Sequence, residues 1–417
     1  MSAVIISNRC KYFVQRKKRY CKMLVKSGED FCGEHQMPVD PSEKKTEDTK
    51  MRIVCPLDRK HTVYTCNLKK HLKICNAGKK NNEQYISTDI NSGKSKGQEN
   101  DSNESYQMLS SFNKEKILSV IERVNLIYQD HVKLSNKLLS NEIVESEIKK
   151  SEYGMKTKKH LKQASAIIGL LENYKLLNDN TCYIEFGAGR GQLSWWIAEV
   201  TKSFSNSKSL LIERASPKHK KDNKLAKTTN KMHRIRTDIK DLVLDHISVI
   251  NETNDIVGVT KHLCGEATDF AIRCMTNLNL NRDKLCGCLL TFCCHHRCSW
   301  TSYVGKSFFM NVGLTKEEFN IMCGLSSWAT CGIGLSSEYK AKFNQNKEEM
   351  VQKENTFEYG LTRQEREEIG RKCKNIINWG RLNYLESQGL TSFLHNYVTK
   401  DTTLENVCIV SYINKIK

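Results

Sequence analysis

A glycine-rich turn stands at residues 181–192, which read TCYIEFGAGRGQ. The letters before the glycines are typical of a short strand, and LSWWIAEV after them has the apolar spacing of a helix. Gly187, Gly189 and Gly191 fall between the two, where the missing Cβ permits a positive φ and lets a ligand approach the helix N-terminus. The turn therefore indicates a pocket for a nucleotide-like cofactor; the alternative is a tight connection with no ligand.

The spacing of the glycines and the neighbouring acids favours S-adenosylmethionine in that pocket. A dinucleotide fingerprint has glycine at its first, third and sixth positions, and the sixth position here is Gln192. Glu185, two residues before the first glycine, suits the cationic amino group and sulfonium of S-adenosylmethionine better than a pyrophosphate. After the next two predicted strands, Glu213 can accept both ribose hydroxyls and Asp238 can hold the adenine amino group.

Two further apolar runs each end in a group of reactive side chains. DIVGVT (residues 255–260) is followed by Lys261 and His262, and CGCLLTF (286–292) by CCHHRC, which contains His295. Ligands of open α/β sheets bind beyond the carboxyl ends of the strands, so these side chains should face one cleft. A catalytic or substrate-binding role is favoured. A third zinc site is a weaker alternative, because adjacent cysteines point in divergent directions, and plain packing is another.

The first 38 residues contain the ligands of a small zinc finger. Cys10, Cys21, Cys32 and His35 offer three thiolates and one imidazole, which can close a tetrahedral zinc shell. So short a segment, with few large apolar side chains, could hardly fold without such a staple.

A second set of ligands follows at Cys55, His61, His71 and Cys75. His71 and Cys75 stand four residues apart, so both point the same way from the helix indicated by LKKHLKIC. Cys66 is a rival ligand that would replace His61. Either set predicts a second small zinc finger, so we expect two zinc ions in all.

The composition indicates a basic protein with a polyanionic partner. The net charge is +19 and the pI is near 9.1, a surplus that usually signals nucleic acid, although an acidic membrane surface gives the same signature. Residues 16–19, beside Tyr20, and residues 218–236 supply cations for phosphates, and a solvated basic surface is the alternative.

The apolar runs and the cysteines bear on the compartment. No run approaches the roughly 18 apolar residues that span a bilayer. We therefore expect a soluble intracellular protein, in cytoplasm or nucleus, with no membrane contact and no obligate protein partner. The 18 cysteines would be mostly reduced there, which favours metal binding or burial over disulfides.

Composition and periodicity divide the chain into five parts. The fingers occupy residues 1–38 and 50–80, and the polar stretch 81–111 is interpreted as a flexible linker. Apolar residues at three- and four-residue steps over 112–152 predict a helical connector, for which a coiled coil is a weaker alternative. Alternating strand and helix patterns over 153–417 predict an α/β domain, and the closing strand ENVCIVSYI is consistent with a methyltransferase sheet.

Together these motifs resemble one family closely, the eukaryotic tRNA 2′-O-methyltransferases that modify the nucleotide at position 4 of the acceptor stem. The likeness rests on YFVQRKKRYC in the first finger, on the CHHC set of the second, and on IEFGAGRGQLS, TKHLCGEATD and CCHHRCSW, in the family's order. It spans most of the chain, with little contribution from residues 76–152. The resemblance implies transfer of a methyl group from S-adenosylmethionine to a ribose 2′-hydroxyl of tRNA, on a Rossmann-like class I methyltransferase sheet.

That chemistry needs a group that takes the proton of the weakly acidic 2′-hydroxyl or polarises the ribose. Lys261, His262 and His295 are the candidates for this catalytic role, and the sequence does not choose among them. An RNA-binding zinc-finger protein with a vestigial methyltransferase fold is the alternative function. All three acidic positions of the pocket are present, which favours an active enzyme. Methylation of a base or of a protein is a further alternative, and TKHLC lacks the proline typical of many base N-methyltransferases.

Overall fold

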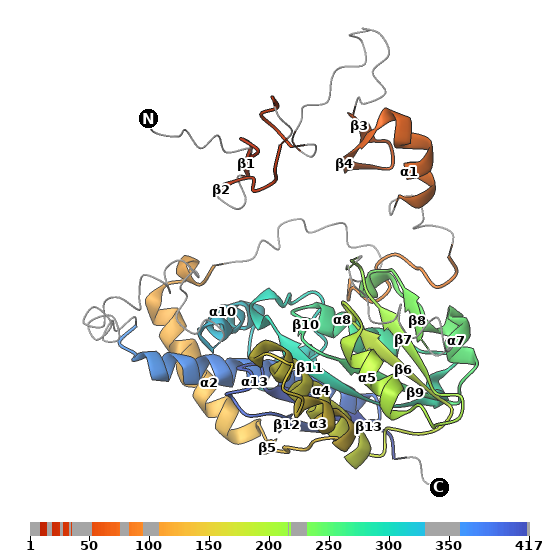
Figure 1. The fold of residues 1–417 in the computed structure, drawn as a ribbon. Coiled ribbons are helices and arrows are strands. Elements are labelled where there is room, and N and C mark those ends of the chain that lie inside the picture. The colour runs from red at the N-terminus through yellow and green to blue at the C-terminus, as the bar shows by residue number, and fades with distance from the viewer. Residues whose placement is uncertain are drawn as a thin grey trace. The chain divides into compact units, whose positions relative to one another are not determined.

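The computed structural model describes residues 9–14, 19–25, 28–32, 35, 52–75, 83–94, 108–215, 217, 232–329 and 359–414, without the side chains of 58–61 and 74. The chain divides into two compact units, Met1–Glu83 and Gln84–Lys417. Figure 1 shows the elements of each unit.

The first unit holds the two predicted fingers. The first finger has an antiparallel pair, β1 (Phe13–Val14) with β2 (Arg19–Tyr20). The second has β3 (Arg52–Cys55) paired antiparallel with β4 (Asp58–Tyr64), followed by helix α1 (Leu68–Ile74). Among the described side chains of this unit, the buried hydrophobic ones are Cys10, Cys32, Cys55, Val63 and Cys75. A core made mostly of thiols has too little apolar area to hold these elements without a metal.

The second unit is built on a sheet of nine described strands. Their order is β5-β12-β13-β11-β9-β6-β7-β8, with β10 paired to β11 beside this path. The strands β6 to β9 and β11 are parallel, and β13 is antiparallel to β11. The bounds are β5 (Leu134–Asn136), β6 (Thr181–Phe186), β7 (Lys208–Ile212), β8 (Met232–Ile235), β9 (Asp255–Thr260), β10 (Leu263–Cys264), β11 (Leu285–Cys293), β12 (Thr391–Asn396) and β13 (Val407–Tyr412).

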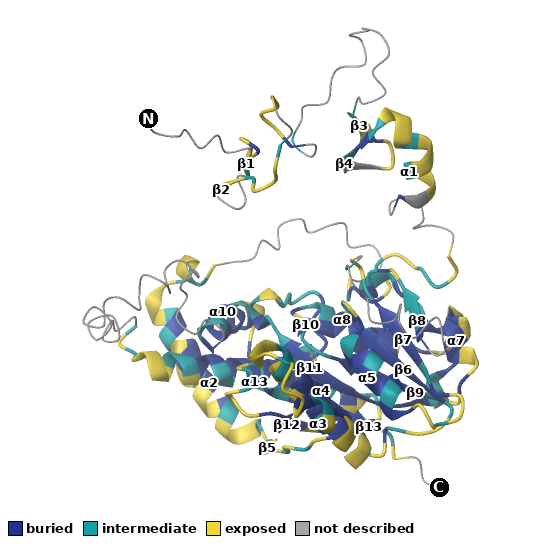
Figure 2. Ribbon diagram, in the orientation of Figure 1, coloured by how far each residue is buried: buried dark blue, intermediate teal, exposed yellow. Residues whose placement is uncertain are grey.

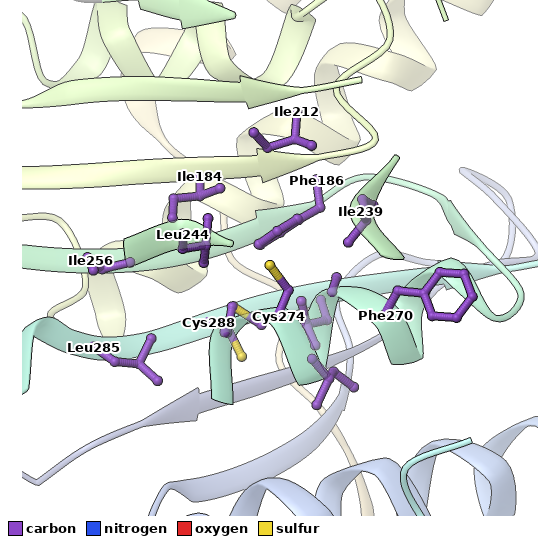
Figure 3. Packing of buried hydrophobic residues seen from close by; sticks show 14 of the residues in the cluster. Ile184, Phe186, Ile212, Ile239, Leu244, Ile256, Phe270, Cys274, Leu285 and Cys288 are labelled. Atoms are coloured by element: carbon purple, nitrogen blue, oxygen red, sulfur yellow. The ribbon is translucent and has the colours of Figure 1, made fainter. Parts of the chain in front are cut away.

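Helices cover both faces of this sheet, which is why its central strands are continuous apolar runs. On one face, α3 (Glu142–Ile148), α4 (Met155–Asn173) and α5 (Gln192–Val200) pack against alternate residues of the strands, including Tyr183 and Val257. On the other face, Ile184, Phe186 and Cys288 meet α8 (Ala267–Thr276) and the last turns of α13 (Arg363–Ser387). Figure 3 shows part of this second core, and Figure 2 shows that the central strands are buried.

A further apolar cluster forms beside the sheet, where α13 packs against three other helices. These are α2 (Lys114–His131), α9 (Lys306–Asn311) and α10 (Lys316–Ser326). Asn113 caps α2 by accepting from the amide of Lys116, and Thr315 with Glu318 forms a capping box on α10. None of the helices described has the length and apolarity to cross a bilayer.

The predicted helical connector, 112–152, is in part a strand. Helix α2 ends at His131, the chain turns extended at Val132, and β5 then pairs in parallel with β12, Leu134 opposite Leu394. Leu134 continues the three- and four-residue apolar spacing, but it joins the edge of the sheet instead. Pairing with an exposed strand edge supplies backbone hydrogen bonds that local periodicity does not reveal.

The segment 83–94 is docked on the second unit, so the predicted flexible linker, 81–111, is wrong over these residues. Asn91 is buried, and its Nδ2 donates to the backbone carbonyls of Ile239, at 2.9 Å, and Leu242, at 2.7 Å. Arg273 donates to the carbonyl of Asn91 at 2.9 Å. Hydrogen bonds hold this polar segment, which is why its composition gave no sign of docking. Residues 95–107 lie outside the described chain.

An Asn91→Ala variant is expected to lower the free energy of unfolding by about 1–3 kcal/mol, because two buried carbonyls lose their shared donor. Urea-induced unfolding of the full chain measures this change. Asn178→Ala is the matched control, since its exposed Nδ2 donates to one carbonyl, that of Lys175. Equal stability of the two variants would show that Asn91 does not hold the docked segment.

Candidate cofactor and catalytic site

The glycine turn has the backbone that its sequence predicts. Gly187, Gly189 and Gly191 have φ of 68°, 51° and 72°, and Gly191 precedes α5 as its N-cap. A Cβ on Gly187 would lie 2.7 Å from Cδ1 of Leu263, whereas a Cβ on Gly189 would meet nothing within 4 Å. The turn therefore needs glycine for its conformation and leaves open space above Gly189, as a bound cofactor requires.

The carboxylates predicted at the strand ends lie on this turn and beside it. Glu213 follows β7 and accepts from the backbone amides of Gly189, at 2.8 Å, and Ala215, at 2.7 Å. Asp238 caps a short helix, Ile239–Asp241, and pairs with Arg214 at 3.2 Å. The predicted pocket residues Glu213 and Gly189 are thus in direct contact.

One residue at the turn was not anticipated. Arg234, on β8, donates to the carbonyl of Gly189 at 3.0 Å. Its place in the strand MHRI, where it is partly buried, was the only signal. Gly189 is therefore bound twice: Arg234 donates to its carbonyl, and Glu213 accepts from its amide.

Glu185 is buried within β6, with 3% of its surface exposed. Its carboxylate accepts from the backbone amide of Ser194, at 2.9 Å, and from the Ser194 hydroxyl, at 2.5 Å, in the first turn of α5. Burial raises the pKa of Glu185, while Ser194 and the nearby cations Lys261 and Arg234 oppose that rise. Glu185 therefore links the first strand of the site to the helix that follows the glycines.

Lys261 lies next to the turn, because Phe186 pairs with Thr260 in the register of β6 and β9. Its Nζ donates to the backbone carbonyl of His160 on α4, at 3.1 Å. Burial lowers the pKa of Lys261 to about 8, and the carboxylate of Glu185 limits the fall. The amine is therefore neutral in a useful fraction of molecules near neutral pH.

His262 follows in a left-handed conformation, with φ of 62°. Its amide donates to the Thr291 hydroxyl at 3.0 Å, and its Nε2 donates to Oε1 of Gln163 on α4 at 3.0 Å. Burial first, and then the charge of Lys261, lowers the pKa of His262 to about 4. The ring is therefore neutral at physiological pH, and its strained backbone is typical of a functional site.

The structure does not bring His295 to Lys261 and His262. His295 is 2% exposed, and its Nε2 donates to Oδ1 of Asn378, on α13, at 2.9 Å. Helix α13 packs on the sheet face opposite α4, so the expected single cluster of three catalytic side chains separates into two groups. Burial, followed by the charges of Arg381 and Lys374, holds the pKa of His295 well below its ordinary value.

His295 instead lines a cavity of about 250 Å³ beside β11 and α13. Its Nδ1 and the Nδ2 of Asn378 are buried without a hydrogen-bond partner among the described residues. The cavity wall carries both signs of charge, from Glu368, Arg371, Lys372, Lys374, Lys400 and Glu405. Unpartnered polar atoms in a charged cavity indicate room for a polar ligand.

A buried ion pair that the sequence did not reveal holds the loop after β10. Arg381, on α13, contacts Asp269, on α8, through Nη2–Oδ2 at 2.6 Å and Nε–Oδ1 at 3.2 Å, and both side chains are almost fully buried. Nη2 also donates to the carbonyl of Gly265, at 3.2 Å, just after β10. The sequence feature that could have revealed this ion pair is an arginine among the inward-facing residues of a long amphipathic helix.

The ligands of the first finger come together as predicted. The ligand atoms of Cys10, Cys21, Cys32 and His35 all lie within 4.8 Å of one another. Burial opposes ionisation of Cys10, but the amides of Cys32 and Tyr12 and the His35 ring outweigh it and lower its pKa to about 6. A thiolate is the form that binds zinc, so these donors suit the metal.

In the second finger, Cys55, His71 and Cys75 form the corresponding group. Nε2 of His71 lies 3.2 Å from Sγ of Cys55, and Sγ of Cys55 lies 3.7 Å from Sγ of Cys75. The side chain of His61 lies outside the described residues. Cys66 is exposed and does not belong to the group, so the rival ligand set is not supported.

Fold and site together define a class. Parallel strands in the order β8-β7-β6-β9-β11 are followed by the antiparallel β13. The glycine turn after β6 contacts Glu213, which follows β7. This is the arrangement of a Rossmann-like class I methyltransferase, as the sequence predicts.

Comparison with known families agrees. Residues 162–412 match the family model described as Methyltransferase TRM13, residues 8–36 its CCCH zinc finger, and residues 52–76 a U11-48K-like CHHC zinc finger. The chain belongs to the TRM13 methyltransferase family. The predicted family, its S-adenosylmethionine cofactor and its two zinc-binding modules are therefore confirmed.

Similar curated proteins cover nearly all of the chain. The "tRNA:m(4)X modification enzyme TRM13 homolog" of Mus musculus is 33% identical over 97% of this chain and 94% of its own length. The Homo sapiens homolog is 34% identical, over 97% and 95%, and the Saccharomyces cerevisiae enzyme 30%, over 97% and 96%. A solved coclaurine N-methyltransferase aligns with 72% of this chain and 87% of its own length at 12% identity, with a TM-score of 0.29.

Proposed function

We propose that this methyltransferase acts on tRNA and transfers the methyl group to the ribose 2′-hydroxyl of the nucleotide at position 4 of the acceptor stem. The names of the relatives support tRNA as the substrate, and the family resemblance of the motifs supports the ribose oxygen. The observation that carries the chemistry is Lys261, a buried amine with a lowered pKa beside the glycine turn. A 2′-hydroxyl is a weak acid and needs such a base.

The site residues divide the work between two groups. Glu185, Glu213 and Asp238 would hold the cofactor over the glycine turn, and the cofactor would supply an electrophilic methyl group. Neutral Lys261 accepts the hydroxyl proton, because its bond to the carbonyl of His160 orients the nitrogen lone pair. His262, neutral and fixed by Gln163, positions the ribose.

His295 is assigned to binding of the tRNA away from the reacting ribose. Its unpartnered Nδ1 and the neighbouring Nδ2 of Asn378 can bind polar groups of another nucleotide that enters the cavity. The cations of the cavity wall suit phosphates of the same strand. This role needs no titration of His295, whose pKa burial holds well below its ordinary value.

Incubation with labelled S-adenosylmethionine and total tRNA, followed by alkaline hydrolysis, tests the reaction. A 2′-O-methyl group blocks cleavage at its own linkage, so a labelled, alkali-resistant dinucleotide is expected, and sequencing places it in the acceptor stem. A labelled mononucleotide would instead indicate methylation of a base. No label, with tRNA still bound, would favour the RNA-binding protein with a vestigial fold.

The first finger is proposed to contact tRNA through exposed aromatic rings. Tyr20 is 65% exposed and meets Phe13 edge-on, with ring centroids 5.3 Å apart. Tyr12 instead stacks on the zinc ligand His35, at 4.0 Å, and supports the finger itself. The basic runs 16–19 and 218–236 lie mostly outside the described residues.

A Tyr20→Ala variant is expected to weaken tRNA binding about 5-fold or more, because stacking of a base on an aromatic ring contributes about 1–3 kcal/mol. Fluorescence anisotropy with labelled tRNA measures the affinity, and zinc content should not change. Leu24→Ala, at a 72% exposed position of the same finger, is the control. Equal affinities of the two variants would exclude Tyr20 from the interface.

A further inference from the structure

Three cysteines outside the two fingers gather at the carboxyl edge of the sheet. The short strand β10 pairs in parallel with the end of β11, so Cys264 lies opposite Cys293. Cys294 follows in a left-handed conformation, with φ of 53°. Because of this turn, the side chains of Cys293 and Cys294 both lie near Cys264, whereas adjacent side chains on a regular strand point to opposite faces.

The three sulfur atoms lie close enough together to ligate one metal ion, although the pair Cys264 and Cys293 is closer than in a bound site. Sγ of Cys264 lies 3.0 Å from Sγ of Cys293 and 3.6 Å from Sγ of Cys294, and all three lie within 4.8 Å of one another. A tetrahedral zinc site with Zn–S bonds of about 2.3 Å separates its sulfurs by about 3.8 Å. For comparison, the Sγ–Sγ distances in the two fingers of the same chain are 3.7 Å and 4.0 Å.

We propose that Cys264, Cys293 and Cys294 bind a third zinc ion. Three thiolates fill three positions of a tetrahedral shell, and Cys264 is exposed, so water can reach the fourth. Binding releases the three thiol protons to solvent. The complex carries one net negative charge, and Arg297 packs on the same loop, where its Cβ would lie 2.7 Å from a Cβ on Gly265.

Such an ion would tie together the two loops that carry the candidate site. Cys264 comes two residues after His262, and Sγ of Cys293 lies 3.2 Å from the carbonyl of His262. Thiolates held by a metal would fix the left-handed backbone of His262 against the end of β11. The proposed ion would therefore stabilise the loop after β9 by linking it to the end of β11, and it would be separate from the zinc ions of the two fingers.

Zinc content of the full chain, measured by inductively coupled plasma mass spectrometry after exhaustive dialysis, tests the proposal. Three zinc ions per chain are expected for the unaltered protein and two for Cys264→Ser. Cys66→Ser is the control, since Cys66 is also exposed and belongs to none of the cysteine groups; it should retain three. Two ions in the unaltered protein, or no loss in Cys264→Ser, would overturn the proposal.

Two further measurements distinguish a metal site from a disulfide and identify the thiols that bind the ion. Titration of thiols in denaturant with a chelator should find all 18 cysteines; two fewer would indicate a disulfide between Cys264 and Cys293 and contradict a metal site. After replacement of zinc by cobalt, the thiolate-to-cobalt absorption should fall in Cys294→Ser as it does in Cys264→Ser. An unchanged spectrum in Cys294→Ser would remove that residue from the site.

Discussion

A Lys261→Met variant is expected to lose methyl transfer by about 10²-fold or more, while its affinity for S-adenosylmethionine stays within a few-fold. The reason is that methionine fills the volume of the buried stem but has no basic nitrogen to accept the hydroxyl proton. Single-turnover transfer to tRNA measures the rate, and isothermal titration with the cofactor measures the affinity.

The pH profile distinguishes a base from a merely structural lysine. Lys261 has a pKa of about 8, so the neutral amine is scarce below this value, and kcat/KM should rise with pH through about 8 and then level off. Lys261→Arg keeps the positive charge at every accessible pH and should lack this rise.

The matched control for this position is Lys284→Met. Nζ of Lys284 also donates to a backbone carbonyl, that of Ile250 at 3.1 Å, but it lies at the opposite end of the sheet, just before β11. Its transfer rate should equal that of the unaltered protein. Turnover of Lys261→Met at the control rate would remove Lys261 from the mechanism and leave His262 as the candidate.

The central sheet could be predicted because its signals are local. The apolar run 255–260 is β9 with the same bounds, and the run before Gly187 is β6. Each run is short, mostly apolar and ends at a turn or at polar residues, as is typical of a strand covered on both faces. The positive φ of Gly189 and its neighbours follows from glycine at those positions.

Long-range contacts could not be predicted in this way. The sequence places His295 at the end of a strand but does not tell on which face the neighbouring helix packs, and here His295 bonds to Asn378 on α13. The docked Asn91 meets carbonyls about 150 residues away, which no periodicity records.

The second large effect is expected at Arg381, whose replacement by methionine should lower the free energy of unfolding by about 3–5 kcal/mol. Methionine would leave the carboxylate of Asp269, which is fully buried, without its cation, and the carbonyl of Gly265 without this donor. Urea-induced unfolding of the full chain gives the stability of the single variant.

A double variant separates the ion pair from packing at the same place. Replacing both partners, as Arg381→Met with Asp269→Leu, removes the uncompensated charge, and we expect it to recover most of the lost stability. Methyl transfer by the double variant should stay low, because the loop at Gly265, which follows the two catalytic candidates, would still lack its tie to α13. A single variant as stable as the unaltered protein would mean that Asp269 is neutralised in another way. A fully active double variant would mean that Lys261 and His262 are positioned without Arg381.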